Sequence, residues 1–200
     1  GSDVWYHITS DVIPFPNGAQ GYLHLIDDIS AWKRTEQMLE NYASIDGLTG
    51  TCTRRVGSQK LEELIETREE ENNCAAFVDV DGLKEINDNY GHNEGDFAIK
   101  TIAEILLSCV RSKDWVIRFG GDEFLVLFLD CMEDMAKVAM SRMYAALEQK
   151  NQELDKPYKL SFSVGISQIT PEMEHISDVI RVIDAGMYRE KTAKKESGAR

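Results

Sequence analysis

Two strongly apolar runs flank the tetrapeptide Gly-Gly-Asp-Glu near the middle of the chain, and they constrain the fold more than any other feature. The stretch WVIRFGGDEFLVLF covers Trp115 to Phe128. Both runs are rich in β-branched and aromatic residues, which predicts two strands. Glycine supplies the positive φ that tight hairpin turns need, so the pattern predicts an antiparallel hairpin with Asp122 and Glu123 at its tip. Acidic residues are also ordinary in turns, so these two alone do not indicate a ligand site.

A second acidic cluster lies at the end of another predicted strand, CAAFVDVD, at residues 74–81. Asp79 and Asp81 are two residues apart and therefore face the same side of a strand. If this strand neighbours the hairpin, Asp79 comes close to Asp122 and Glu123. Carboxylates at close range repel one another unless a cation neutralises them, and oxygen-only ligands suit Mg²⁺ or Mn²⁺. Together the clusters predict a divalent-metal site; the alternative is a solvated strand end.

The residues directly after this strand have the character of a nucleotide pocket. Gly82 allows backbone amides to approach a ligand closely. The helix expected over Lys84–Tyr90 has an N-terminus that favours anions, and the lysine adds a charge suited to phosphate. An amide and a carboxylate at Asn87 and Asp96 can pair with guanine, which has donors at N1 and N2. Their alternative roles are a helix cap and a turn residue.

The composition excludes several classes of protein. The chain has 22 Lys and Arg against 35 Asp and Glu, a formal charge of −13, which argues against a broad nucleic-acid-binding surface. Its four cysteines form no C-x-x-C pair and its four histidines are scattered, so we predict reduced thiols, no zinc site and a cytoplasmic location. No apolar run reaches the ~18 residues of a membrane span, and no membrane contact is expected of this fragment. Gly1-Ser2 resembles an expression remnant, so the chain is expected to start inside a longer protein.

The first thirty residues predict a small separate element. Residues 3–29 read as two strands joined by the turn Pro16–Gln20. A two-stranded hairpin is marginally stable alone, so it must pack on another surface. Ser30 is the expected N-cap of a helix over 31–44. That helix carries a short apolar stripe, typical either of a coiled coil or of a plain amphipathic connector: Trp32, Leu39 and Tyr42.

From residue 46 onward the pattern becomes mixed. Helices are expected over about 56–71, 84–90, 94–110 and 134–154 and from about 177, and strands over 74–81, 115–119, 124–129 and 159–167. Because the hairpin requires antiparallel pairing, we predict an α+β fold with a mostly antiparallel central sheet and helices on both faces. The expected core-facing helical residues follow a period of 3.6: Leu61, Leu64, Ile65, Phe97, Ile102, Ile105 and Leu106.

Several spaced motifs resemble one known family. DVDGLKEINDNYGHNEGD followed by RFGGDEF resembles the GGDEF family, the diguanylate cyclases of bacterial second-messenger signalling. The resemblance covers about residues 44–195, with supporting motifs in the family's order: DGLTG at 46–50, SVGIS at 163–167 and IDAGMYREK at 183–191. The first part of the chain resembles the end of a PAS sensor domain. The expected organisation is therefore a PAS C-terminal hairpin over 1–30, a connector helix over 31–45 and a GGDEF catalytic domain over 46–200.

The resemblance implies an activity and a site. Two GTP molecules condense to cyclic di-GMP with loss of two pyrophosphates, between two chains that each hold one GTP. The resemblance places the metals on Asp79, the Val80 carbonyl, Asp122 and Glu123, with Lys84 assisting catalysis. It leaves open whether Asp122 or Glu123 takes the proton of the ribose 3′-hydroxyl. The substrate-binding residues that it implies are Gly82, Leu83, Lys84, Lys191 and Lys195 for phosphate, and Asn87, His92 and Asp96 for guanine.

A product-inhibition site is also implied. RSKD, residues 111–114, matches the family's R-x-x-D motif, and Arg142 falls where the family places a second arginine for the same ligand. Arginine forks suit phosphate and guanine edges, so Arg111, Asp114 and Arg142 are expected to bind cyclic di-GMP. The alternative is a helix-terminal arginine with a turn aspartate.

The chain also departs from the family pattern. Thr51 replaces a leucine, Thr53 an asparagine and Gly82 a bulkier residue, and Lys194-Lys195-Glu196 stands where Gly-Arg-Asn is usual. A lysine in place of arginine loses bidentate phosphate contact, so these departures bear on nucleotide affinity. Three hypotheses remain: an active cyclase, a catalytically silent receptor of GTP or cyclic di-GMP, and a dimerising sensor fragment that is inactive.

Overall fold

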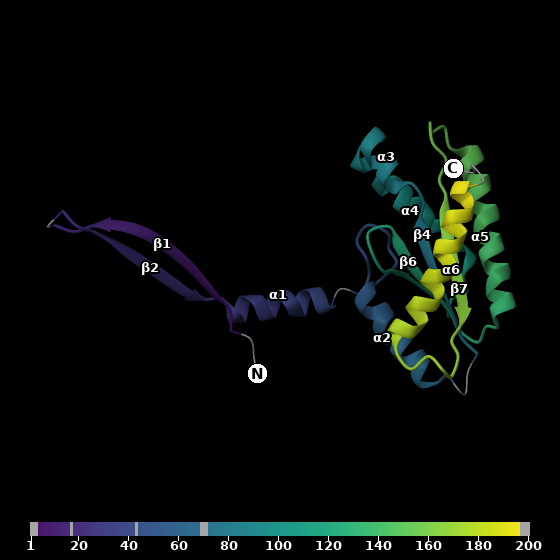
Figure 1. Cartoon of the computed structure of the whole chain (residues 1–200), viewed down its shortest axis with the longest axis horizontal. Helices are drawn as coiled ribbons and strands as arrows, with labels where there is room; N and C mark the ends of the chain where they lie inside the picture. The colour runs from purple at the N-terminus through teal and green to yellow at the C-terminus, as the bar shows by residue number, and fades with distance from the viewer. Residues whose placement is uncertain (1–3, 17, 43, 69–71, 197–200) are drawn as a thin grey trace. The chain divides into compact units, whose positions relative to one another are not determined.

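The computed structural model describes residues 4–16, 18–42, 44–68 and 72–196, apart from the side chains of residues 37–42 and 195. Contacts divide the chain into two units, residues 1–43 and 44–200. The elements of both are labelled in Figure 1. Each unit is described by itself.

The first unit is the predicted hairpin followed by a helix. Strands β1 (Tyr6–Pro14) and β2 (Gln20–Asp28) pair antiparallel, with Ile8 opposite Ile26, and α1 covers Ser30–Tyr42. Residue 17, in the predicted turn, lies outside the described residues. Almost every hairpin side chain is exposed within this unit, including the large apolar ones. The hairpin therefore has no core of its own.

Ser30 does not have the predicted capping role. It is the first residue of α1, and its hydroxyl accepts a hydrogen bond from the Trp5 backbone N–H at 2.9 Å. The Asp28 carboxylate instead accepts the Ser30 N–H at 2.9 Å, and hydrogen bonds with Ser30 lower the pKa of Asp28. Aspartate and serine side chains are equally suited to accept hydrogen bonds from the free N–H groups at the start of a helix. Here Asp28, not Ser30, accepts such a bond. Trp32 is exposed, whereas the side chains of residues 39 and 42 lie outside the described ones.

The second unit is built on a five-stranded sheet in the order β3-β5-β6-β4-β7. Its strands are β3 (Cys52–Thr53), β4 (Cys74–Val80), β5 (Trp115–Arg118), β6 (Glu123–Phe128) and β7 (Phe162–Gln168). Only the short β3 pairs parallel, with β5, and the other neighbours are antiparallel. The predicted α+β fold with a mostly antiparallel sheet is confirmed.

Helices cover both faces of this sheet, as predicted. They are α2 (Arg54–Glu66), α3 (Leu83–Tyr90), α4 (His92–Cys109), α5 (Glu133–Glu153) and α6 (Ile176–Glu196). One core lies beneath α4 and α5, and a second lies beneath α2 and α6. Strand β4 contributes to both, because alternate residues such as Ala76 and Phe77 point to opposite faces. Figure 1 shows α6, in yellow, lying along the sheet.

Two details differ from the sequence-based expectations. Phe97 is only partly buried, and the Lys156 ammonium lies 4.8 Å over its ring; the other predicted core residues of α2 and α4 are buried. Helix α2 ends at Glu66, and the predicted extension to residue 71 enters residues that are not described. No helix in the described part of the chain is long and apolar enough to cross a membrane.

The hairpin turn differs as well. Neither Gly120 nor Gly121 has a positive φ, contrary to the prediction, and four residues separate β5 from β6. Glycine at position 120 fits for a different reason, because the Glu123 side chain would have to move to make room for a Cβ. A Cβ there would lie 2.3 Å from a carboxylate oxygen of Glu123. The turn therefore uses the small size of this glycine rather than its backbone freedom.

Candidate active site

The pairing of β4 with β6 brings the two acidic clusters together. Asp79 lies opposite Glu123 in the register, and the Val80 N–H donates to the Asp122 carbonyl at 3.0 Å. Asp79 is 8% exposed, whereas Asp122 and Glu123 are partly exposed at the tip. The two central strands thus end with three acidic residues next to one another. The proximity predicted from sequence is confirmed.

Arg118 secures the tip of the hairpin. Its Nε and Nη2 atoms donate to the Gly121 carbonyl at 3.3 and 2.8 Å, while Nη1 forms an ion pair with Asp46 at 3.2 Å. Asp46 also accepts the Thr49 N–H and hydroxyl at 2.9 and 2.7 Å. Burial raises the pKa of Asp46, but the bonds with Thr49, followed by those with Arg118, outweigh it and leave the pKa lowered. A guanidinium fork therefore links the DGLTG segment to the carboxylate-bearing turn.

The Asp79 carboxylate already has a cationic partner. Lys191 on α6 donates from Nζ to Oδ1 at 2.6 Å. Burial raises the pKa of Asp79, the charges of Asp122 and Asp81 act in the same direction, and Lys191 opposes them. For Lys191, burial lowers the pKa, but the bond with Asp79 and the nearby acids outweigh it and leave it raised. The site therefore holds an ammonium group where a cation is needed.

Glu123 lies in a crowded electrostatic environment. Burial raises its pKa first, and the charges of Asp122, Asp79 and Asp184 add to that, against a smaller opposite effect of Arg54. The Arg54 guanidinium lies 4.5 Å over the Phe119 ring beside the turn. Repulsion among carboxylates is the physical cause that makes such a cluster receptive to a divalent cation. Within the described residues, however, no three potential ligand side chains converge as a preformed metal site.

Asp81 belongs to a different environment. Its two carboxylate oxygens accept the hydroxyls of Ser161 and Ser163 at 2.7 and 2.8 Å, and its N–H donates to the Ser161 carbonyl. Lys194 lies 3.8 Å from it. These bonds fix the end of β4 against the start of β7. The Asp81 carboxylate therefore has a structural role, holding the end of β4 to the start of β7.

Gly82 begins the predicted phosphate loop. It precedes α3 with φ 68° and ψ 16°, and its carbonyl accepts the Ile86 N–H. A left-handed conformation favours glycine, so its absence of a side chain suits this backbone. Leu83 and Lys84 form the first turn of α3: the leucine packs on the core and the lysine is exposed. The turn presents N–H groups and the exposed Lys84 side chain towards solvent.

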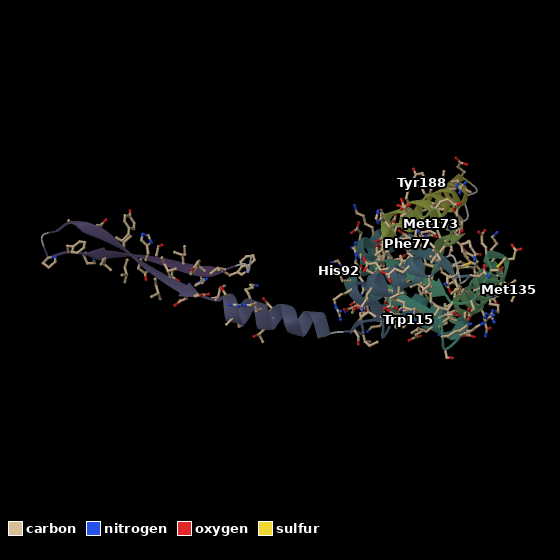
Figure 2. All side chains as sticks on the ribbon, turned by 90° about the horizontal axis from the view of Figure 1, so that it is seen from below. Phe77, His92, Trp115, Met135, Met173 and Tyr188 are labelled. Atoms are coloured by element: carbon tan, nitrogen blue, oxygen red, sulfur yellow. The ribbon has the colours of Figure 1, made fainter. Side chains whose placement is uncertain are left out.

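The structure places one predicted guanine-binding residue, Asn87, against the residue that precedes another, Asp96. Asn87 on α3 lies against Gly95 on α4, because a Cβ at Gly95 would be 2.1 Å from the Asn87 amide oxygen. Asp96 is the next residue and is exposed. His92 begins α4 and is also exposed, at the edge of the domain in Figure 2.

The end of α6 holds the remaining predicted phosphate ligands. Lys191 contacts Asp79, while the Lys195 side chain lies outside the described residues. Lys194, one of the departures from the family pattern, donates to the Phe162 carbonyl at 2.5 Å and pairs with Glu190 at 2.7 Å. Its ammonium is thus used within the fold, between α6 and β7.

Arg111, Asp114 and Arg142 line one cavity of about 210 Å³. The Asp114 carboxylate accepts the N–H groups of Arg111 and Leu129 at 2.9 and 3.2 Å, so it also stabilises the turn, as the alternative reading required. Arg142 donates to the Cys109 carbonyl at 3.1 Å. The cavity is smaller than the roughly 300–1,000 Å³ of typical ligand pockets, so a dinucleotide would be only partly enclosed. Met135, at its rim, lies at the outer surface in Figure 2.

Comparison with known proteins now decides the family. Residues 43–197 match the model of the diguanylate cyclase GGDEF domain. The chain belongs to the GGDEF diguanylate cyclase family. It is 31% identical over 160 residues to the probable diguanylate cyclase DgcC of Escherichia coli K12, an alignment covering 79% of this chain and 43% of that protein. The chain therefore spans less than half the length of this curated relative.

Two solved structures share the fold. Diguanylate cyclase SiaD from Pseudomonas aeruginosa, in complex with its activator SiaC, superimposes with a TM-score of 0.69 at 28% identity, covering 82% of this chain and 64% of SiaD. A microbial GGDEF domain described in an interaction with cyclic di-GMP gives a TM-score of 0.64 at 29% identity, covering 76% and 95%. Both likenesses support the arrangement of helices around the sheet.

Some residues of the GGDEF site were missed by sequence reasoning. Arg118 stands inside the RFGGDEF motif and Asp46 inside DGLTG, but no local pattern shows that the two pair across 72 positions. Asp184 affects the pKa of Glu123 from α6. The only signal was that each lies within a family motif.

Proposed function

We propose that this chain condenses two GTP molecules into cyclic di-GMP and two pyrophosphates. One observation carries the proposal: Asp79 and Glu123 face each other across β4 and β6, with Asp122 beside them. The site lies next to the start of α3, where N–H groups and Lys84 suit phosphate. Because GTP is the substrate, we further propose that the domain works in the cytoplasm.

The carboxylate set fits Mg²⁺ or Mn²⁺. Its donors are hard oxygens, its charges repel one another, and the Lys191 ammonium at 2.6 Å from Asp79 is a stand-in for a bound cation. Asp79, the Val80 carbonyl, Asp122 and Glu123 would hold the ion or ions. A bound ion would neutralise charge on the triphosphate and acidify the ribose 3′-hydroxyl.

The protein's own groups bind the phosphates, orient the substrate and accept the proton. The backbone at Gly82 and Leu83, with Lys84, Lys191 and Lys195, binds and orients the phosphates so that the 3′-oxygen can attack the α-phosphorus in line. The hydroxyl proton passes to Asp122 or Glu123. Arg118 keeps the turn in place while this happens.

Asn87 and Asp96 read the base in this proposal, assisted by His92. A carboxylate accepts from the N1 and N2 donors of guanine, whereas adenine has no matching donors there. Such a site rejects adenine strongly, because its own polar groups would be left unpaired.

The reaction requires two chains. The described residues provide one set of metal-binding acids and one pair of guanine readers, whereas the product contains two guanylates. We therefore propose a homodimer in which two half-sites face each other. We also propose that the hairpin over 1–30 is the end of a PAS sensor domain and that α1 connects it to the cyclase.

Product feedback is proposed at Arg111, Asp114 and Arg142. A GGDEF domain of the same fold is described with cyclic di-GMP, and two guanidinium groups at one cavity suit its phosphates. Calorimetry with cyclic di-GMP should show weaker binding to Arg111→Ala than to the wild type. Equal affinity of the two proteins for cyclic di-GMP would mean that residues 111–114 only stabilise the turn.

The test of the proposed function is incubation with GTP and Mg²⁺ or Mn²⁺, followed by mass spectrometry. Cyclic di-GMP should appear with the wild type and be lost with Asp122→Ala, whose melting temperature should stay close to that of the wild type. Guanine-selective binding without any product would favour the alternative, a silent receptor. Wild-type turnover by Asp122→Ala would refute the metal assignment.

A further inference from the structure

Helix α3 depends on α4 for its position. It packs mainly against α4, and Figure 1 shows it projecting at the end of the sheet. Ile86 is its one buried residue. Whatever fixes the turn between the two helices therefore also fixes Asn87 relative to Asp96.

The two guanine readers are sensitive to this geometry. The Asn87 amide lies directly on the backbone of Gly95, one residue before Asp96. The approach is so close that a Cβ on Gly95 would be 2.1 Å from the amide oxygen. A small shift of α3 along α4 would change the spacing of the amide and the carboxylate, and hence the fit to a base edge.

A segment from elsewhere in the chain holds this turn. Residues 154–161, between α5 and β7, carry Lys156 and Tyr158. The Tyr158 hydroxyl donates to Glu94 Oε2 at 2.5 Å, and Lys156 Nζ donates to both Glu94 oxygens at 2.9 and 2.8 Å. The Tyr158 ring packs on Tyr90, the last residue of α3, with centroids 5.1 Å apart. The segment thus contacts the first turn of α4 and the end of α3 together.

The charges in this contact strengthen it. Bonds from Lys156 and then Tyr158 lower the pKa of Glu94, and burial, followed by the bond with Glu94, raises the pKa of Tyr158. At neutral pH the carboxylate is therefore ionised and the phenol protonated. A hydrogen bond of this kind is charge-assisted and stronger than one between neutral groups.

We propose that Tyr158 and Glu94 are positioning residues that determine guanine selectivity. They do not touch the base; they hold α3 and α4 at the spacing that lets Asn87 and Asp96 read it. This inference rests on the proposed function only through the guanine pocket. It does not require that the chain complete the cyclisation.

The experiment is a binding measurement that does not depend on turnover. The probes are 3′-deoxy-GTP, which lacks the attacking hydroxyl, and 3′-deoxy-ITP, which also lacks the 2-amino group of guanine. Calorimetry with Mg²⁺ should show that the wild type prefers 3′-deoxy-GTP. Tyr158→Phe keeps the ring on Tyr90 and removes only the hydroxyl. It should weaken 3′-deoxy-GTP by roughly ten- to a hundredfold, the order expected for one lost bond to a charged group, and 3′-deoxy-ITP much less.

Two further variants test the mechanism. Glu94→Ala removes the acceptor of both Tyr158 and Lys156, so it should lower selectivity at least as much as Tyr158→Phe. Adding Tyr158→Phe to it should cost little more, because the bond that the two residues share is already lost. Tyr144→Phe is the matched control, since Tyr144 also donates to a carboxylate, Glu190, at 2.5 Å and stacks on an aromatic ring, Phe162. It should leave the selectivity ratio unchanged.

The outcomes separate this inference from the proposed function. A wild type that prefers 3′-deoxy-GTP, together with a Tyr158→Phe variant of unchanged selectivity, would overturn the inference alone. Equal weakening of both probes would also overturn it, since a general structural loss would then explain the effect. A wild type without preference would overturn both this inference and the guanine pocket. Selective binding without synthesis of cyclic di-GMP would overturn only the proposed catalysis.

Discussion

Gly165 marks the closest contact between β7 and α6, and replacing it should test how tightly the α6 side of the site is constrained. A Cβ built there would lie 1.7 Å from the Ile183 carbonyl oxygen and 2.5 Å from the Met187 backbone nitrogen. These atoms belong to the backbone of α6 and cannot rotate away as a side chain can. One turn further along the same helix, Lys191 reaches Asp79.

The expected cost of Gly165→Ala follows from this geometry. Overpacking of a core costs about 1–3 kcal/mol, and a clash with helix backbone belongs at the upper end of that range. Alanine returns about 0.4–1 kcal/mol by restricting the unfolded chain. The net loss in the free energy of unfolding should be about 2 kcal/mol, which lowers the melting temperature by about 4–8 °C for a domain of this size.

Thermal unfolding followed by circular dichroism measures this loss. Gly47→Ala is the control, because a Cβ there meets nothing within 4 Å and the residue has no positive φ. Gly186→Ala should be intermediate, since its Cβ would lie 3.3 Å from the Gly165 Cα. If Gly165→Ala melts within 1 °C of the wild type, the close packing of α6 on β7 is not as described and the reasoning fails.

Three other predictions concern the turn and its surroundings. Arg118→Ala removes the ion pair with Asp46 and both donors to the Gly121 carbonyl, so cyclic di-GMP synthesis should fall about tenfold or more, the order of one misplaced catalytic group; a rate assay showing unchanged turnover would contradict it. Asp130 has φ 44°, so Asp130→Val should lower stability by about 1–2 kcal/mol in thermal melts while Asp130→Asn stays close to the wild type. The raised pKa of Glu123 means that its ionisation is less favourable in the folded than in the unfolded chain, a penalty absent below the ordinary pKa and complete above the raised one. Glu123→Gln should therefore melt higher than the wild type at pH 7.5 in chelator, with the difference vanishing near pH 4; an equal difference at both pH values would refute this.

The fold was predictable from sequence where its signals were local. β4 is a short apolar run buried on both faces, and the two apolar runs around Gly-Gly-Asp-Glu pair antiparallel as the hairpin prediction required. The reason for glycine at position 120 was not predictable, because it depends on where the Glu123 carboxylate lies. The capping role of Asp28 was missed in the same way, since both Asp28 and Ser30 have suitable side chains and only the backbone path distinguishes them.

The site was predictable in its residue types but not in its present interactions. Asp79, Asp122 and Glu123 lie next to one another as expected, because the pairing register of β4 and β6 places Asp79 opposite Glu123. The bond between Lys191 and Asp79 links residues 112 positions apart, and the hydrogen bond between Tyr158 and Glu94 links residues 64 positions apart. No periodicity or spacing in the sequence carries such long-range pairs. They depend on the packing of whole helices against the sheet.

The pairing of Lys191 with Asp79 has a consequence for how substrate and metal enter the proposed site. Without a cation, the acids at the ends of β4 and β6 would repel one another, and Lys191 relieves part of that repulsion within the fold. A divalent ion on Asp79 would replace the ammonium and leave it beside a like charge. A triphosphate bound together with the ion would remove that conflict, because the Lys191 ammonium could then pair with a phosphate oxygen. The metal–nucleotide complex should therefore enter more favourably than either component alone, since only the pair leaves every charge at the site with an opposite neighbour.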